Sequence, residues 1–304
     1  MKIQNRAKIC LCISIVIMLV AVVMSLTGHG INYGIDFAGG LNLQYDMGST
    51  YDKADVEEAL KAQGIEEFVV SSVGSEGTAV QIRVPTLSDE DEVQNLQNGL
   101  ETTLLEKYPN MDTDNATASY VGPVAGATLV RNAIFSVLIA AVLMLIYIAF
   151  RFDLFSGVAA VAGLLHDVLI MISFMVILRS VIQMNSSFIA AMLTIVGYSI
   201  NNTIVIFDRI RENNKKPALA GQPRSEIVEL SVKESLGRTI NTTLTTLVTI
   251  VTLYILGVAS IREFSLPIII GILAGAYSAN LINGYVWAAL EDARLARKSQ
   301  KKAA

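Results

Sequence analysis

Charged residues are scarce in this chain of 304 residues, and so are cysteine and histidine. Asp, Glu, Lys and Arg make up 16% of the residues and hydrophobic residues 53%, which is typical of polytopic membrane proteins rather than soluble domains. Both cysteines lie in the first apolar run, which excludes a disulfide framework or thiol metal site outside the membrane. The two histidines, His29 and His166, are separated by the predicted topology, and the sequence contains no Gly-rich phosphate loop, zinc spacing or nucleophile elbow. We therefore expect no enzyme, no cofactor and no metal.

The charges that are present are unevenly distributed. Between His29 and Arg131 there are five basic and seventeen acidic residues, a net charge of −12, whereas the rest of the chain has a net charge of +8. Nucleic-acid binding requires basic patches, so this acidic insert argues against it. The simplest interpretation is that the acidic residues keep a water-exposed domain soluble.

Six apolar runs are long enough to span a membrane. The first is longer than the core of a cleaved signal peptide and is followed by SLTGHG, so we interpret it as an uncleaved anchor. We expect spans at residues 9–26, 133–150, 154–178, 188–207, 239–258 and 266–290. The predicted fold class is a polytopic α-helical membrane protein with six transmembrane helices and a small α+β extracytoplasmic domain between the first two.

Basic residues predict the orientation of these spans. The amino terminus, the segment 208–238 and the carboxyl-terminal tail are all basic, so the positive-inside rule places them in the cytoplasm together with both termini. Residues 224–237 predict an amphipathic helix on the membrane surface. The predicted divisions are a cytoplasmic N-terminus with the first helix (1–28), an extracytoplasmic domain (29–132), helices two to six with cytoplasmic loop 208–238 (133–290), and a basic tail (291–304).

The insert has a recognisable order of elements. Alternating apolar residues predict strands, and amphipathic patterns between them predict two helices. The expected strands are 41–45, 68–73, 79–84 and 116–121, and the expected helices are 52–62 and 88–107. The order βαββαβ indicates a ferredoxin-like domain. Such a domain displays surfaces and edges, and nothing in its sequence resembles a catalytic site.

An ionisable pair lies inside the third span. His166 and Asp167 are about 20 Å along the helix from Leu154, near the middle of a bilayer. At that depth such a pair indicates a functional site, with Asp167 as an ion-path candidate. The alternative is a pair whose polar atoms are satisfied by neighbouring helices.

The fourth span also carries polar residues. Asn201 and Asn202 lie deep within it, and Thr194, Gly197 and Asn201 share a face that continues to Asp208. Polar side chains are costly in hydrocarbon unless they find partners. We therefore expect this face to line a helix–helix contact or an ion path.

The fifth and sixth spans add hydroxyls and small residues. Thr242 and Thr246 share a face from which we expect hydrogen bonds to adjoining helices. Arg238, at the start of the fifth span, is either an ion-path residue or a cation that snorkels to the interface. Gly271 and Gly275 in the sixth span permit close helix contact.

Five motifs, in this order and spacing, resemble the SecF family of bacterial protein-export membrane proteins along nearly the whole chain. They are YGIDFAGG at 33–40, VGPVAG at 121–126, the His166-Asp167 pair, GYSINNTIVIFDRIREN at 197–213 and RTINT at 238–242. The family-motif residues in the first and fourth are Gly34, Asp36, Phe37, Gly39, Gly40, Gly197, Tyr198, Ser199, Asp208 and Arg209.

The resemblance implies an accessory subunit of the Sec translocase in the bacterial plasma membrane. Proteins of this kind pair with SecD in a complex similar to transporters of the resistance-nodulation-division class. The complex promotes late steps of protein export and draws on a proton or sodium gradient. The implied partners are SecD, the SecYEG channel, membrane lipid and, transiently or indirectly, SecA and exported polypeptides.

One position departs from the family pattern. The family commonly has aspartate where this chain has Asn202, and an amide cannot bind and release a proton. Three interpretations remain open: SecD's own intramembrane acid carries the ion alone, Asn202 coordinates sodium, or Asp167 takes over. Two rival functions also remain, namely a subunit of a small-molecule or ion pump and a passive scaffold for SecD.

Overall fold

The computed structural model describes residues 3–73, 77–85, 87 and 90–303, and it separates into two compact units. The insert unit comprises Tyr33–Ile134 together with the short segment Gln183–Ser186. The membrane unit comprises Met1–Asn32, Phe135–Ile182 and Ser187–Ala304.

The insert unit is the predicted α+β domain. Its elements are α2 (Ile35–Ala38), β1 (Gly40–Asp46), α3 (Lys53–Ala62), β2 (Val69–Val73), β3 (Ala79–Val84), α4 (Glu90–Lys107) and β4 (Asp112–Val121). The strands form one antiparallel sheet in the order β2-β3-β1-β4, in which β1 pairs with both β3 and β4. This is the order that βαββαβ connectivity gives when each helix crosses over the same face. The start that we predicted for the second helix, at residue 88, lies outside the described residues.

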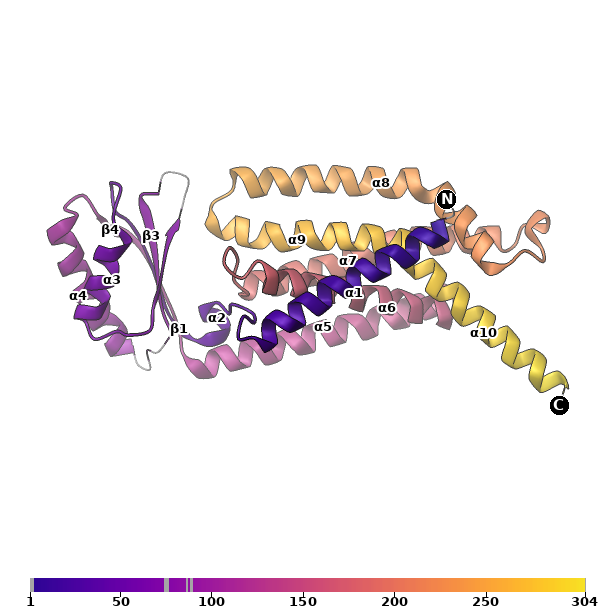
Figure 1. Cartoon of the computed structure of the whole chain (residues 1–304), viewed down its shortest axis with the longest axis horizontal. Coiled ribbons are helices and arrows are strands. Elements are labelled where there is room, and N and C mark those ends of the chain that lie inside the picture. The colour runs from indigo at the N-terminus through magenta and orange to yellow at the C-terminus, as the bar shows by residue number, and fades with distance from the viewer. Residues whose placement is uncertain (1–2, 74–76, 86, 88–89, 304) are drawn as a thin grey trace. The chain divides into compact units, whose positions relative to one another are not determined.

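One face of the sheet carries the hydrophobic core of this unit. Leu41, Leu43 and Tyr45 alternate along β1 and are all fully buried, beneath α3 and α4 on the same side of the sheet (Figure 1). From α4, Leu100 and Leu104 reach the same core. Burying each such side chain contributes about 1.5–3 kcal/mol, so the alternation seen in the sequence is what holds the insert together.

The YGIDFAGG motif of the insert unit bonds the segment Gln183–Ser186 of the same unit. The backbone N–H of Gly34 donates to the carbonyl of Met184 at 2.9 Å, and the Asp36 carboxylate accepts from the backbone N–H of Ser186 at 2.8 Å. The Ser186 hydroxyl also contacts this carboxylate. Since Ser186 is the first residue of a membrane helix, Asp36 places a negative charge at that helix's amino end, where the helix dipole favours it.

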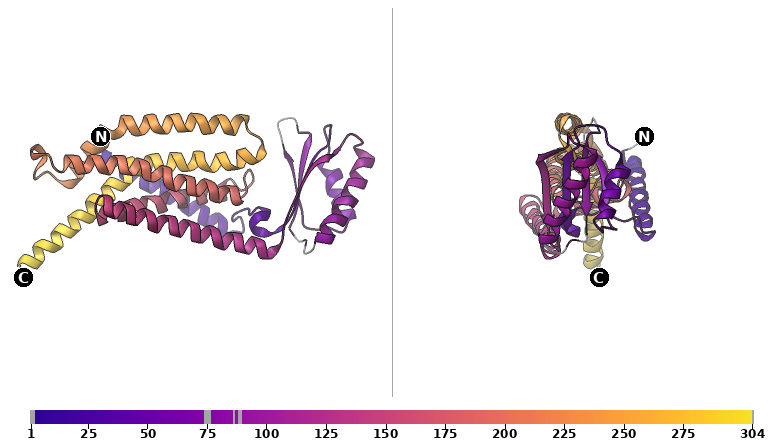
Figure 2. Two further views of the ribbon diagram at one scale, coloured as in Figure 1. Left: turned by 180° about the vertical axis from the view of Figure 1, so that it is seen from behind. Right: turned by 90° about the vertical axis from the view of Figure 1, so that its left-hand side faces the viewer.

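The membrane unit contains the remaining helices. They are α1 (Ile3–Leu26), α5 (Pro123–Arg151), α6 (Leu154–Ile177), α7 (Ser186–Asn213), α8 (Arg224–Leu256), α9 (Ala259–Ser278) and α10 (Gly284–Ala303), with short turns η1 (Pro217–Leu219) and η2 (Ala279–Asn283). Six stretches of the described chain are long and apolar enough to cross a membrane, because α9, η2 and α10 run on as one (Figure 2). The predicted fold class is confirmed.

Two details of these helices differ from the sequence prediction. The segment 224–237 is the first part of α8 rather than a separate surface helix, because Val228 and Val232 are buried in the apolar cluster that also holds Phe207 and Trp287. The sixth span is not a plain α-helix either. Residues Ala279–Asn283 form a π-helical turn, a feature that often occurs at functional sites.

Helices α6 and α7 and the continuous α9–η2–α10 stretch form the interior of the membrane unit. The apolar windows of these three spans are 56%, 50% and 61% buried, whereas only 6% of the α5 window and 11% of the α1 and α8 windows are buried. The peripheral helices therefore present large apolar side chains outward, as lipid or partner helices require. Because α6 and α7 lie in this apolar interior, each of their buried polar side chains needs a hydrogen-bond partner.

Candidate intramembrane polar site

Asp167 is the centre of a hydrogen-bonded cluster inside the membrane unit. Its side chain is completely buried, about halfway along α6. One carboxylate oxygen, Oδ2, accepts from the Ser199 hydroxyl at 2.5 Å and from the Ser278 hydroxyl at 2.9 Å. The other oxygen, Oδ1, lies 3.0 Å from Nδ1 of His166. The buried carboxylate is thus held by α6, α7 and α9 together.

His166 extends this cluster to the first helix. Its Nε2 lies 2.8 Å from the Ser14 hydroxyl and 3.0 Å from the Tyr277 hydroxyl, and these two hydroxyls are themselves 2.6 Å apart. The Tyr277 ring packs edge-on against the imidazole, with ring centroids 5.3 Å apart. We call Ser14, His166, Asp167, Ser199, Tyr277 and Ser278 the His–Asp cluster.

Glycines on α9 make this close packing possible. A Cβ added at Gly275 would lie 3.1 Å from the Cβ of Ser199, and one added at Gly271 would lie 2.5 Å from the Ile195 side chain. The contact that the two glycines predicted is therefore present, between α9 and α7. It brings Ser278, one turn beyond Gly275, within reach of Asp167.

The π-helical turn adds a second pair of interhelical hydrogen bonds. Asn283 donates to the Thr203 hydroxyl of α7 at 2.8 Å, and the Asn280 amide oxygen accepts from the Thr239 hydroxyl of α8 at 3.1 Å. Gly163 leaves room for this, since a Cβ there would lie 2.0 Å from Oδ1 of Asn283. These residues were not predicted from the sequence, although the polar sequence YSAN at 277–280 in an apolar span indicates such a site.

The two asparagines of the fourth span have different surroundings. Asn202 is buried, with only 1% of its surface exposed, and its Nδ2 has no hydrogen-bond partner among the described residues. Asn201 is exposed on the outside of α7. Neither residue is hydrogen-bonded to Asp167, so the family position at 202 is not part of the His–Asp cluster.

A polar stripe runs along the exposed side of α7. Thr194, Gly197, Asn201 and Asp208 are all exposed, at the spacing that the sequence predicted for one face. Asn201 lies about 22 Å along a helix of about 42 Å. This face therefore lies on the outer surface of the membrane unit, where it is available to partners outside its own helix.

Helix α8 carries a similar stripe, but one expectation about it was wrong. Arg238, Asn241 and Thr245 are exposed at helical spacing. We expected the Thr242 hydroxyl to bond an adjoining helix; it donates instead to the carbonyl of Arg238 at 2.9 Å, within its own helix. Threonine hydroxyls commonly satisfy themselves in this way in apolar helices, so their presence alone does not indicate a neighbouring helix. One threonine of α8 that does bridge helices is Thr239, through Asn280.

The charged end of the GYSINN motif lies at the far end of α7. Arg209 donates to Glu212 at 2.6 Å and to Glu234 of α8 at 2.7 Å, and Asn213 also donates to Glu234 at 2.7 Å. Asp208 lies 3.7 Å from Arg151. These contacts fix the loop between α7 and α8 but lie away from the His–Asp cluster, so we assign them a structural role.

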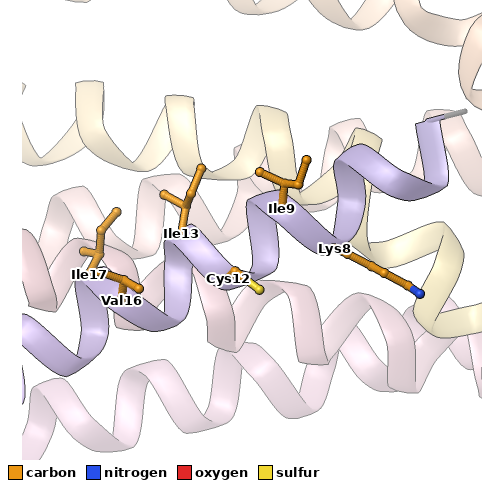
Figure 3. A pocket seen from close by; sticks show the side chains of 6 residues that line it. All are labelled: Lys8, Ile9, Cys12, Ile13, Val16 and Ile17. Carbon is orange, nitrogen blue, oxygen red and sulfur yellow. The ribbon is translucent and has the colours of Figure 1, made fainter. Parts of the chain in front are cut away.

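A groove of about 410 Å³ follows the outer side of α1 (Figure 3). It is lined by Lys8, Ile9, Cys12, Ile13, Val16 and Ile17. Apart from the ammonium of Lys8 at one end and the thiol of Cys12, these side chains are aliphatic, which suits hydrocarbon chains rather than an ion. Among the described residues, moreover, no group of three His, Cys, Asp or Glu is placed to hold a metal.

Comparison with known proteins gives matches along the whole chain. A family model described as the C-terminal part of protein export membrane protein SecD/SecF matches residues 101–293, and the SecD/SecF GG motif matches residues 25–49. The protein translocase subunit SecF of Rickettsia bellii is 35% identical over 280 residues, covering 92% of this chain and 90% of the relative. The subunit SecDF of Bacillus subtilis is 34% identical over 92% of this chain but over only 37% of its own length.

Solved structures agree with this assignment. The crystal structure of SecDF from Thermus thermophilus, a translocon-associated membrane protein, superposes with a TM-score of 0.79 at 32% identity and covers 95% of this chain and 38% of that one. A SecDF structure in a super-membrane-facing form gives a TM-score of 0.68 at 31% identity, covering 99% and 40%. The YGIDFAGG motif, the six apolar stretches and the α+β insert thus occur together in a set of relatives that match in both sequence and fold, and the chain belongs to the SecD/SecF family of protein export membrane proteins, as a SecF-type member.

Proposed function

We propose that this SecF-type chain is an accessory subunit of the Sec protein translocase that acts with SecD to promote late steps of protein export. The observation that carries the proposal is the exposed polar stripe of α7, with Asn201 near mid-membrane. A side-chain amide in hydrocarbon is unfavourable by several kcal/mol unless it is hydrogen-bonded. Helices of a partner chain supply the missing hydrogen bonds.

SecD is the partner that the relatives favour. The SecDF relatives are single chains more than twice as long as the part that matches here. A chain of SecF type has only that part, so its exposed stripes on α7 and α8 are where a separate SecD subunit docks. The whole complex then contacts the SecYEG channel, and it meets SecA and exported polypeptide only indirectly or transiently.

The basic residues support a plasma-membrane orientation with both termini in the cytoplasm. The segment between α7 and the apolar part of α8 is rich in Lys and Arg, whereas the insert is acidic. The insert therefore works on the outer side of the membrane, where exported polypeptide emerges. Ion movement through the membrane helices drives its action, and the buried ionisable pair His166–Asp167 supports an ion-dependent role.

Export and co-purification together test this proposal. Gly197 is exposed on the stripe, and a Cβ added there would meet no atom within 4 Å, so Gly197→Leu adds bulk for a partner without disturbing the chain itself. We expect the variant to be made at normal levels, to lose co-purification with SecD and to slow late export. Leu143→Trp, which adds bulk on the exposed side of α5, is the matched control. Normal SecD capture by Gly197→Leu, with normal export, would remove the basis of the proposal.

A passive scaffold is the second candidate, and Asn202 is the observation that favours it. The amide at 202 cannot carry a proton, and its Nδ2 is without a partner in the described part of the chain. If Asn202→Asp leaves export and its ion dependence unchanged, position 202 is structural here. A small-molecule pump, the remaining rival, predicts altered drug susceptibility with normal secretion in a deletion strain.

A further inference from the structure

The His–Asp cluster holds hydrogen-bonding groups beyond those that contact the Asp167 carboxylate. The carboxylate itself accepts from two serine hydroxyls and lies 3.0 Å from one imidazole nitrogen. The opposite ring nitrogen, Nε2 of His166, faces two hydroxyls that also contact each other. The contacts of Nε2 therefore determine whether the His166–Asp167 pair can hold a second proton.

In the first state Asp167 is ionised and His166 is neutral, with its proton on Nδ1. Nδ1–H then donates to Asp167, and Nε2 accepts from the Ser14 hydroxyl at 2.8 Å. The Tyr277 hydroxyl donates to the oxygen of Ser14 at 2.6 Å. Every polar atom of the pair has a partner, and the cluster carries one negative charge.

In the second state Nε2 carries a proton as well. Nε2–H donates to the oxygen of Ser14 or Tyr277, and the Tyr277 hydroxyl keeps its bond to Ser14. The Ser14 hydroxyl turns to donate to the carbonyl of Cys10 at 3.0 Å. Only hydroxyl groups have rotated, and no heavy atom needs to move. The cluster is now neutral overall, and both protonation states are fully hydrogen-bonded.

We propose that the His–Asp cluster is a proton-binding site, at which His166 takes up one proton on Nε2 while Asp167 stays ionised. The proposal rests on the function proposed above and assigns its coupling ion and its site. Nε2 is a nitrogen atom, which accepts a proton but is a poor ligand for a hard cation such as sodium, so the ligand is a proton. His166 is also the member that reaches the surface, since its side chain is 12% exposed and that of Asp167 is not exposed at all.

The groups around the cluster allow this assignment. Tyr277 of α9 and Cys10 of α1 are the other titratable side chains that face it. From α7 it receives the hydroxyl of Ser199. Within the described residues, no Lys, Arg or Glu side chain is hydrogen-bonded to the cluster. The charge of Asp167 is therefore unbalanced in the first state and is balanced by the second proton on His166 in the second state.

Nitrogen NMR of the histidines tests the proton positions directly. The chain has two histidines, so His29→Gln leaves His166 as the only labelled imidazole in the full chain, purified with its partner in lipid nanodiscs. On acidification we expect Nδ1 to remain protonated throughout and Nε2 to change from an accepting to a protonated nitrogen. A proton on Nε2 with none on Nδ1, or an Nε2 that never changes, would overturn the proposal.

Export driven by an imposed gradient tests the role of the site. We expect Asp167→Asn and His166→Gln to abolish the stimulation of export by a proton gradient while SecD still co-purifies. Ser173→Ala is the matched control, because Ser173 is a buried polar residue of the same helix that bonds only its own backbone. It should leave the stimulation unchanged.

The outcomes separate this inference from the function on which it rests. Failure of the unaltered chain to capture SecD or to stimulate export contradicts the proposed function. Normal proton-gradient stimulation in Asp167→Asn contradicts the proton site and leaves the translocase role intact. Stimulation of the unaltered chain by a sodium gradient alone would likewise overturn the assignment of the proton.

Discussion

The second glycine of the GG motif provides the most direct test of how the sequence determines the insert. Gly40 has a φ of +112°, and a Cβ added there would lie 2.4 Å from the carbonyl oxygen of Val84 and 2.8 Å from the Cα of Pro85. Both are backbone atoms, one of the last residue of β3 and one of the residue that follows it, so neither can rotate away. Gly40→Ala should therefore incur a conformational cost of about 1–3 kcal/mol and a steric cost of about 1–3 kcal/mol.

The matched control is Gly64→Ala. Gly64 also has a positive φ, of +79°, but a Cβ there would meet nothing within 4 Å. Gly64→Ala should therefore incur the conformational cost alone, about 1–3 kcal/mol. The difference between the two variants isolates the clash of Gly40 with β3.

Hydrogen exchange of the β1 and β3 amides in the purified full chain measures both costs. A loss of about 2 kcal/mol in the free energy of unfolding speeds exchange about 30-fold. Such a loss is large, because the whole free energy of unfolding of a domain is only about 5–15 kcal/mol. We expect Gly40→Ala to speed exchange about 5- to 150-fold more than Gly64→Ala, corresponding to the steric cost of about 1–3 kcal/mol. Equal exchange in the two variants would refute the steric reasoning and leave the motif's second glycine unexplained.

Three further predictions concern single hydrogen-bonded groups. Asn283→Ala removes the bond to Thr203 and should lower the free energy of unfolding by about 1–3 kcal/mol, measured by thermal denaturation in detergent. The Tyr108 hydroxyl, 2.6 Å away, is the main cause that lowers the pKa of Asp55 below its ordinary value. Asp55 thus stabilises the insert above about pH 4, and this contribution is lost as the pH falls through the folded-state pKa; Asp55→Asn should flatten that acid dependence of unfolding. Asp36→Asn removes a charge from the amino end of α7, and we expect exchange in the first turn of α7 to rise about two- to fivefold, corresponding to about 0.3–1 kcal/mol.

Much of the fold could be predicted because it follows from local pattern. Strict alternation at Leu41, Leu43 and Tyr45 identifies a strand with one buried face, and apolar length identifies a span. The continuity of α8 was hidden because charged residues at 224–238 interrupt the apolar signal, although backbone hydrogen bonding does not depend on it. The π-helical turn has no sequence pattern of its own and was missed.

The candidate site was predictable only at its centre. Asp167 was conspicuous because a carboxylate is rare in hydrocarbon. Ser14 and Ser278 are small hydroxyl residues that apolar helices tolerate, and they acquire a role only when packing brings four helices to the same point. Asn201 and Asn202 are neighbours in sequence, yet one is exposed and the other buried, because adjacent residues of a helix point about 100° apart.

The wide turn at Ala279–Asn283 lets the sixth span hold an extra residue without re-orienting the helix that follows. A π-turn contains one residue more than an α-turn and takes it up within a single wider turn, so α10 keeps the faces that a regular helix would present. Deleting one residue there would restore regular α winding and leave Trp287 buried against its neighbours. The deletion would instead disturb Asn280 and Asn283, whose side chains reach Thr239 and Thr203 from this turn. The extra residue therefore serves bonding between neighbouring helices, whereas the packing at Gly271 and Gly275 does not depend on it.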